Sequence, residues 1–386
     1  MPGVNRMHAA LEFSRPALWG IAFGLAVVAV VYIYEAANIG GLGYTRDAAA
    51  AVVATSTQVQ TPPPPKYPPL DKAAYDKKMW QLANATTADP VILVVATSSA
   101  SSTSATSTPK KKPLWPVTAA PYPKDGALLP FNRIVAYYGN FYSKGMGVLG
   151  QYPTDVMLQK LASTTEAWRK ADPATPVIPA IHYIVETAQG SAQADGTYRL
   201  QMPDSQIDHA LDLATQIHGI VFLDFQVGKS TLQKDLPVYE KYLKMPNVHL
   251  GIDPEFSMKD GVPPGREIGT FDASDVNFAA QYLAKLVDEY DLPPKILIVH
   301  RFTEDMVTHA KQIKPLPEVQ IVMDMDGWGS KAKKTGTYNQ VIYPEPVQFT
   351  GFKLFYKNDI LPPSTGMFTP KELLLFKPQP IYIQYQ

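Results

Sequence analysis

The sequence contains no cysteine among its 386 residues. Without thiols the chain cannot form disulfides, bind zinc through cysteine, hold an iron–sulfur cluster or use a thiol nucleophile. Charged residues are also sparse, at 18%, and the 35 basic side chains are balanced by 35 acidic ones. Because a nucleic-acid-binding domain normally carries a clear basic excess, we expect no nucleic-acid partner.

An uncharged hydrophobic run occupies residues 17–34, with Arg15 before it and Glu35 after it. A helix of this length just crosses a hydrocarbon core of about 30 Å. Arg6 and Arg15 precede the run, so the positive-inside rule places residues 1–16 in the cytoplasm. We predict an uncleaved signal anchor, which makes this a single-pass cell-membrane protein with an extracytoplasmic C-terminal part. A cleaved signal peptide is the alternative.

The next segment, residues 35–125, is rich in proline, serine and threonine, and residues 55–125 alone contain twelve prolines. Such a composition buries too little apolar surface to offset the entropy of the chain. We therefore predict a disordered linker that holds a folded domain, residues 126–386, away from the membrane. Within the linker, the stretch from Asp71 to Asn84 is compatible with a short helix.

From residue 126 onwards, short β-rich apolar runs alternate with helical patterns, as in parallel α/β folds. Eight runs are expected to be strands: 133–138, 177–185, 219–225, 248–252, 296–299, 319–323, 350–355 and 381–385. Eight strands with intervening helices in about 260 residues are typical of a (β/α)8 TIM barrel. An open doubly wound sheet is the alternative. It normally has a glycine-rich turn after its first strand, and the GxGxxG at 145–150 does not open a helix directly.

Helical periodicity predicts helices over 154–171, over 274–290, and from Asp204 as an N-cap residue. Thr303 and Thr369 are cap candidates for two further helices, and Thr369 is followed by proline at the first helical position.

Polar side chains gather where the predicted strands end. In TIM barrels the active site lies at the C-terminal ends of the strands. Because side chains two residues apart in a strand share a face, three pairs are expected to converge on one mouth. They are Asp224 with Gln226, Asp253 with Glu255, and Asp324 with Asp326.

Carboxyl pairs among aromatic side chains are typical of glycoside hydrolases, in which one carboxyl stays protonated and the other is ionised. We predict that Glu255 transfers the proton, with Asp253, Asp224 and Asp326 as candidates for nucleophile, base or electrostatic stabiliser. The predicted substrate-binding residues are Tyr138, Asn140, Glu186, Gln226, His300, Asp324, Trp328, Lys353, Tyr356 and Gln384. We expect no cofactor.

Metal or phosphodiester chemistry is the competing enzymatic interpretation. His182 and His300 both fall at strand positions with acidic residues nearby. However, the sequence has no HExxH motif and no two histidines at close ligand spacing, so we predict no metal site. His182 by itself is more typical of a hydrogen-bonded core histidine. A serine nucleophile in a GxSxG motif is also absent.

Several segments resemble a family of secreted or lipid-anchored bacterial proteins, abundant in actinobacteria, that have a glycosidase-like TIM barrel. The matching segments are Tyr138-Gly139 with 147–150, 224–228, 252–256, 300–302, 326–329, 352–356 and 384–386. The resemblance covers residues 133–386 and implies a barrel on the outer surface of the cell, without implying a particular reaction. This chain differs in having no lipobox cysteine, so the helix itself would be its anchor.

These observations predict a membrane-anchored, extracytoplasmic, glycoside-hydrolase-like protein that acts on a cell-envelope or extracellular polysaccharide by carboxylate acid–base chemistry. The alternative is a non-catalytic glycan-binding or structural envelope module on a stalk.

Overall fold

The structure is a computed structural model that describes residues 66–83 and 120–386. These residues all belong to one compact unit, Pro64–Gln386. The predicted membrane segment, residues 17–34, and most of the predicted linker lie outside the described residues. No helix in the described ranges is long and apolar enough to cross a membrane.

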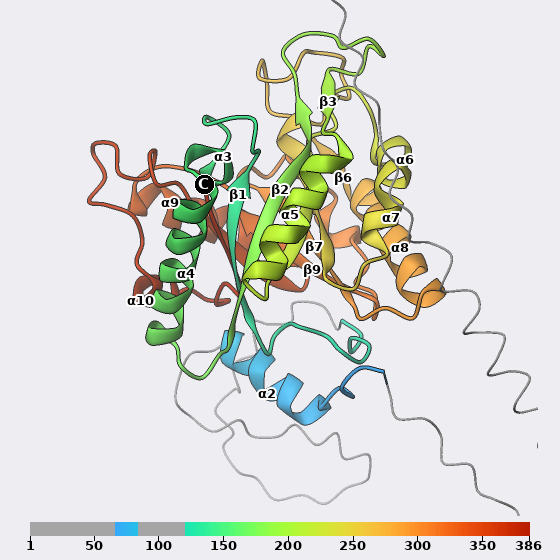
Figure 1. The fold of residues 1–386 in the computed structure, drawn as a ribbon. Helices are drawn as coiled ribbons and strands as arrows, with labels where there is room; N and C mark the ends of the chain where they lie inside the picture. The colour runs from blue at the N-terminus through green and yellow to red at the C-terminus, as the bar shows by residue number, and fades with distance from the viewer. Residues whose placement is uncertain (1–65, 84–119) are drawn as a thin grey trace, which may run out of the picture. The chain divides into compact units, whose positions relative to one another are not determined.

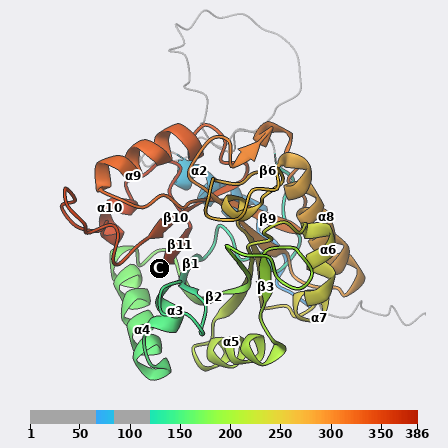
Figure 2. The ribbon, with the colours of Figure 1, turned by 90° about the horizontal axis from the view of Figure 1, so that it is seen from above.

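The described part of the chain contains a closed parallel barrel of eight strands, which confirms the predicted (β/α)8 fold (Figures 1 and 2). Pairing of β1 with both β2 and β11 closes the barrel. Each barrel strand coincides with a predicted run to within a few residues. The strands are β1 (Arg133–Gly139), β2 (Val177–Ala188), β4 (Ile220–Phe225), β5 (Val248–Ile252), β7 (Lys295–Arg301), β9 (Val319–Met325), β10 (Phe349–Leu354) and β11 (Tyr382–Tyr385).

Helices surround the barrel when it is viewed from above (Figure 2). They are α3 (Val148–Gln151), α4 (Thr154–Ala171), α5 (Asp204–Gln216), α6 (Leu232–Asp235), α7 (Glu240–Leu243), α8 (Ala273–Glu289), α9 (Lys331–Thr337) and α10 (Pro370–Leu373). Turns of 3-10 helix are η1 (Leu236–Tyr239), η2 (Pro254–Phe256) and η3 (Ala310–Gln312), and η4 (Tyr338–Ile342) is a π-helical turn. The predicted cap at Thr369 is confirmed by a capping box with Glu372.

Two predicted helix starts are wrong. The N-cap position of α5 is Pro203, so Asp204 lies in the first helical turn instead. After Thr303 the chain forms a turn, in which the Thr303 hydroxyl accepts a bond from Met306 N, and then β8 (Val307–Thr308). This strand pairs with β6 (Phe271–Asp272). The partner strand lies more than 30 residues earlier in the chain, so the sequence around Thr303 gives no sign of it.

The hydrophobic core consists of two layers. An outer cluster fills the space between the strands and helices such as α4, α5 and α8. An inner cluster fills the lower part of the barrel with apolar side chains that include Ile134, Ala180, Phe222, Ile298 and Val322. Polar side chains on the same strands, further along in the C-terminal direction, occupy the upper part of the barrel.

Residues 66–83 differ from the predicted linker, because they fold as part of the barrel domain. Helix α2 (Lys72–Ala83) lies at the N-terminal ends of the strands, below the barrel in Figure 1. Its buried side chains Tyr75, Met79 and Leu82 join the inner cluster. Backbone hydrogen bonds of 2.7 Å from Gln379 N to Leu82 O and of 3.0 Å from Gly126 N to Pro68 O fix the segment. It therefore closes the bottom of the barrel.

Candidate active site

A cavity of about 710 Å³ opens at the C-terminal ends of the strands. Its carboxyl groups come from Asp253, Glu255 and Asp326, which follow β5 and β9. Aromatic and basic side chains complete much of the lining: Tyr138, Phe256, Phe302, Trp328, Phe355, Lys333 and Lys353. Three of the four predicted catalytic residues thus meet in one cavity, and four predicted substrate-binding residues, Tyr138, Gln226, Trp328 and Lys353, lie beside them.

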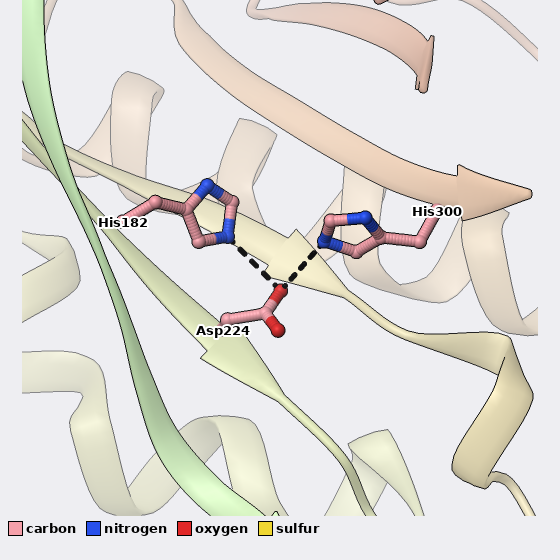
Figure 3. A group of neighbouring side chains, drawn as sticks. All are labelled: His182, Asp224 and His300. Atoms are coloured by element: carbon pink, nitrogen blue, oxygen red, sulfur yellow. Dashed lines mark hydrogen bonds and ion pairs between the residues drawn. The ribbon is translucent and has the colours of Figure 1, made fainter. Parts of the chain in front are cut away.

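The fourth predicted catalytic residue, Asp224, lies beneath this cavity in the barrel interior. Its Oδ1 is 3.1 Å from His182 Nε2 and 3.2 Å from His300 Nε2 (Figure 3). The Tyr138 hydroxyl donates to its Oδ2 at 2.9 Å. Burial alone would raise the pKa of Asp224, but the two imidazoles hold it well below its usual value. Asp224 is therefore a buried anion with a full set of partners, and it does not face the cavity directly.

His182 is a neutral hydrogen-bonding residue of this network. Burial lowers its pKa to about 4, even though Asp224 opposes the shift. Its Nδ1 is 2.6 Å from the Tyr382 hydroxyl, which accepts a bond of 2.8 Å from Gln384 Nε2. A neutral imidazole carries one proton, and the carboxylate of Asp224 favours that proton on Nε2. In this tautomer Nδ1 accepts a hydrogen bond from the Tyr382 hydroxyl.

His300 is a buried cation that links Asp224 to the cavity. Although burial opposes protonation, Asp224, Asp324 of β9 and Asp326 just after β9 raise the pKa of His300 well above its usual value. Its Nδ1 lies 3.2 Å from Asp326 Oδ2 and 3.4 Å from Asp324 Oδ2. Burial raises the pKa of Asp324. The imidazolium thus holds Asp326 in position from below.

Lys353, on β10, holds Asp326 from the other side. Its Nζ is 2.9 Å from Asp326 Oδ1 and 3.9 Å from the centre of the Tyr138 ring. Burial alone would raise the pKa of Asp326, but Lys353 and His300 together lower it. Asp326 is therefore an oriented carboxylate that stays ionised at neutral pH and borders the cavity.

In contrast to Asp326, the carboxyl groups of Asp253 and Glu255 have raised pKa values, which favour their protonated forms. Burial, followed by the nearby carboxylates, raises the pKa of Asp253 well above its usual value, despite the charge on His300. Asp253 accepts hydrogen bonds from Gln226 Nε2 at 3.3 Å and from the backbone N of Glu255 at 3.1 Å. It caps η2 in this way, which fixes the backbone that carries Glu255.

Glu255 is the carboxyl with the most freedom to react. Burial, with the charge of Asp326, raises its pKa to about 7. Within residues 66–83 and 120–386, no side-chain hydrogen bond or ion pair engages its carboxyl group, although its backbone is fixed by bonds to Asp253 and Gly269. At neutral pH a partly protonated carboxyl, without a side-chain partner in the described ranges, thus faces the same cavity as the ionised Asp326.

One group of side chains has donor atoms close enough to hold a metal ion. His182, Asp224 and His300 each offer one such atom, and these lie within 4.8 Å of one another (Figure 3). Two imidazoles and a carboxylate are ligands that Zn²⁺ accepts. The 3.2 Å contact of His300 is nevertheless that of a hydrogen-bonded ion pair, and the 3.1 Å contact comes from the neutral His182. Tyr138 and Tyr382 extend these contacts into a larger network. The prediction of no metal site stays a prediction.

Six predicted substrate-binding residues lie outside the cavity lining. His300 and Asp324 belong to the buried network beneath it, and the other four lie elsewhere. Asn140 shapes the turn after β1, donating to Ile184 O and accepting from Tyr142 N. Gln384 lies in the barrel interior beside Tyr382. Tyr356 stacks on Tyr385 outside the barrel wall. Glu186 is buried in a separate cluster on the far side of β2.

The cluster around Glu186 is structural. Arg199, on β3 (Arg199–Gln201), lies 3.5 Å from Glu186 Oε2 and 2.8 Å from Asp235 Oδ1. Gln201 donates to Glu186 Oε1 at 2.8 Å. Burial, with the charge of Asp235, raises the pKa of Glu186 to about 8. These contacts hold the β2–β3 hairpin above the barrel.

Several residues of the cavity lining were not predicted. The interpretation of His182 as a hydrogen-bonded core histidine is confirmed, because it is fully buried and bonded to Tyr382. It pairs with Tyr138 across β1 and β2 and shares its inward-facing side. Phe302, Phe355 and Lys333 line the cavity from loops and from α9. Their positions depend on loop conformation, which no periodic pattern encodes.

Comparisons with known proteins add little to this description. No family model matches the sequence, and no curated protein matches it. Among solved structures, the chain is similar to a tri-modular GH5 (subfamily 4) endo-β-1,4-glucanase from Bacillus licheniformis, with 12% identity and a TM-score of 0.36. That alignment covers 66% of this chain and 54% of the other, so this chain spans about half its length.

Two further solved structures are similar to the chain, with comparably low sequence identities and TM-scores. A ruminal GH26 endo-β-1,4-mannanase has 13% identity and a TM-score of 0.33, with 66% of this chain and 58% of the other covered. Plasmodium falciparum HPPK-DHPS with pteroate has 9% identity and a TM-score of 0.33, with 69% and 47% covered. Likeness at this level assigns no activity to the chain, so the geometry of the cavity has to carry the functional argument.

Proposed function

We propose that this protein is a glycoside hydrolase acting on a polysaccharide, with Glu255 as the general acid and Asp326 as its ionised partner. One observation carries the proposal. Two carboxyl groups border the same cavity, and their surroundings move their pKa values in opposite directions. Such a divergence is what acid–base hydrolysis of a glycosidic bond requires, because one group must donate a proton while the other is anionic.

The proposed reaction uses both groups at the glycosidic bond. Glu255 donates its proton to the glycosidic oxygen, and the bond from that oxygen to the anomeric carbon breaks. Asp326 stabilises the positive charge that develops on the sugar and removes a proton from the attacking water, or it attacks the anomeric carbon itself. In the second case, water deprotonated by Glu255 breaks the bond between the sugar and Asp326 in a second step, and Asp326 leaves as a carboxylate. The net reaction consumes one water molecule and leaves Glu255 and Asp326 in their starting states.

The surrounding residues have supporting roles in this proposal. Lys353 and His300 keep Asp326 anionic and oriented through contacts of 2.9 and 3.2 Å. Asp224 holds His300 in its charged form, and Asp253 fixes the turn that carries Glu255. Exposed aromatic rings in the cavity, such as Trp328, offer apolar faces on which sugar rings can stack.

We also propose that residues 17–34 anchor the protein in the cell membrane and that the barrel is extracytoplasmic. Support comes from the uncharged run itself and from the arginines that precede it. A polysaccharide of the cell envelope or its surroundings would then be the available substrate.

Reducing-end release from a panel of neutral and acidic polysaccharides tests the proposal. Glu255→Gln and Asp326→Asn should each lower kcat by about 100-fold to 10,000-fold, the usual contribution of a positioned acid or base. Glu289→Gln is a matched control, because Glu289 is exposed at the end of α8 and should leave the rate unchanged.

Two outcomes would contradict the assignment. Hydrolysis that survives both substitutions would place the chemistry elsewhere. Retention of a glycan without any turnover by the wild-type protein would instead support a non-catalytic glycan-binding module, and the same substitutions would then change affinity alone.

A further inference from the structure

Two smaller cavities adjoin the catalytic cavity on the side of α3 and α9. The first, of about 320 Å³, shares the lining residues Gly145, Trp328, Phe355 and Gln386 with it. The second, of about 490 Å³, lies against α4 and meets the first at Tyr356. Neighbouring hollows thus share lining residues, in a series from the carboxyl groups to the outer surface of α4.

The two outer cavities, which we call the side branch, differ from the catalytic cavity in charge. Their linings include Lys144, Lys357 and Lys160, and no aspartate or glutamate side chain. Lys333 stands at the entrance, 4.6 Å from the centre of the Trp328 ring. In the described part of the chain, none of these four exposed lysines has an ion-pair partner, whereas the chain as a whole is neutral.

Aromatic rings accompany the lysines along the side branch. Trp328 is 51% exposed, which is unusual for the largest aromatic side chain and leaves a face open to a ligand. Tyr356 is held by stacking on Tyr385 and by a 3.0 Å hydrogen bond to Tyr137. Lys160 lies 4.7 Å from the centre of the Tyr152 ring. Rings held in place lose little entropy when a ligand binds.

We propose that the side branch binds the continuation of the substrate chain and that the substrate is an anionic polysaccharide, carrying carboxylate or phosphate groups. The inference rests on the proposed function, because it extends the same site. Aromatic faces stack on the sugar rings, and the unpaired lysines contact the negative groups along the chain. A volume of several hundred Å³ beyond the catalytic cavity suits a polymer better than a single small sugar.

Binding is best measured in the Glu255→Gln protein, which would retain the substrate without turnover. The probes are oligogalacturonate as the carboxylate-bearing chain, a glycerol-phosphate polymer as the phosphate-bearing chain, and neutral cello- and manno-oligosaccharides. We expect one of the anionic probes to bind at least tenfold more tightly than the neutral probes, with affinity rising with chain length and falling with salt.

Substitutions in the side branch sharpen the test. Lys160→Met and Lys357→Met should each weaken binding of the anionic probe about fivefold, as expected for ~1 kcal/mol from one exposed charge pair. Lys234→Met is the matched control, because Lys234 is equally exposed and unpaired but lies on α6, away from the side branch. It should leave affinity unchanged.

The outcomes separate this inference from the proposed function. Equal binding of neutral and anionic probes, or unchanged affinity in both lysine variants, would overturn the inference even if neutral glycans are hydrolysed. Equal binding of single-stranded DNA would also overturn it, because the lysines would then form a general polyanion patch. Specific binding of an anionic glycan that the wild-type protein never cleaves would support the side branch and refute the hydrolase proposal.

Discussion

Replacing Glu255 with glutamine should stabilise the protein at alkaline pH, although it lowers kcat by about 100-fold or more. Burial and the charge of Asp326 raise the pKa of Glu255 from 4.5 to about 7 in the folded state. The folded protein therefore retains a proton that the unfolded chain releases, and stability falls as the pH rises from 4.5 to about 7. The difference corresponds to about 3 kcal/mol of unfolding free energy, at about 1.36 kcal/mol per pH unit.

Urea unfolding at pH 5 and pH 8 measures this effect. The stability of Glu255→Gln relative to the wild type should increase by about 2 to 3 kcal/mol between the two pH values, because only the wild type has to ionise a buried carboxyl. Glu289→Gln, on the exposed end of α8, should differ from the wild type by less than about 0.5 kcal/mol at either pH. A pH-independent difference for Glu255→Gln would show that Glu255 ionises like a surface carboxyl, and its role as general acid would lose its basis.

Three further substitutions test the barrel and its charge network. Met79→Ala should lower the unfolding free energy by about 2 to 5 kcal/mol in urea, because Met79 of α2 is buried in the inner core. Gly251→Ala should lower kcat on the order of 100-fold, since the added Cβ would lie 2.3 Å from Asp224 Oδ1 and displace the network. Lys353→Met removes the cation that lowers the pKa of Asp326, so the acidic limb of the kcat/KM profile should move to higher pH.

A defined result would contradict the expectation for each of these three variants. An unchanged urea midpoint for the Met79 variant would mean that α2 is not part of the folded unit. Wild-type turnover by the Gly251 variant would show that the network under the cavity tolerates displacement. Its control is Gly336→Ala in α9, where no atom lies within 4 Å of the new Cβ. That change should be neutral for turnover and stabilising by up to about 1 kcal/mol. A Lys353 variant with an unmoved acidic limb would separate that limb from Asp326.

The barrel could be predicted because its strands are short apolar runs whose ends are marked by polar residues. Both faces of a parallel strand are buried, so the hydrophobic signal is continuous, as in β5 and β7. Strand ends then located Asp253, Glu255 and Asp326, since the C-terminal ends of parallel strands meet at one face. Local sequence was sufficient for these features.

Glu186 is a residue whose position could not be predicted from the alternation of side chains along its strand. Strict alternation places it on the same face as His182, but the pairing of β2 with β4 shifts register between Ile184 and Glu186. A bulge of this kind adds one residue and turns the following side chain to the other face. Helix α2 was left without a role for a different reason. Its apolar residues are few, and the surface that buries them comes from strands far along the chain.

The position of α2 also limits the distance between the barrel and its proposed membrane anchor. Residues 84–119 connect α2 to the segment before β1. The chain on either side of them is bonded at the N-terminal end of the barrel, through Leu82 and Gly126. The number of residues in this connection therefore does not affect the distance between the barrel and the membrane. Only residues 35–65 contribute to that distance.

As the linker that the sequence predicts, these roughly 30 residues would have an average end-to-end distance of about 30 Å. The reach of the barrel domain would then be comparable to its own diameter, and much smaller than the full segment between the proposed anchor and β1 suggests. If the proposed anchor and the proposed hydrolysis both hold, the barrel domain would act on polymer within a thin layer around the cell.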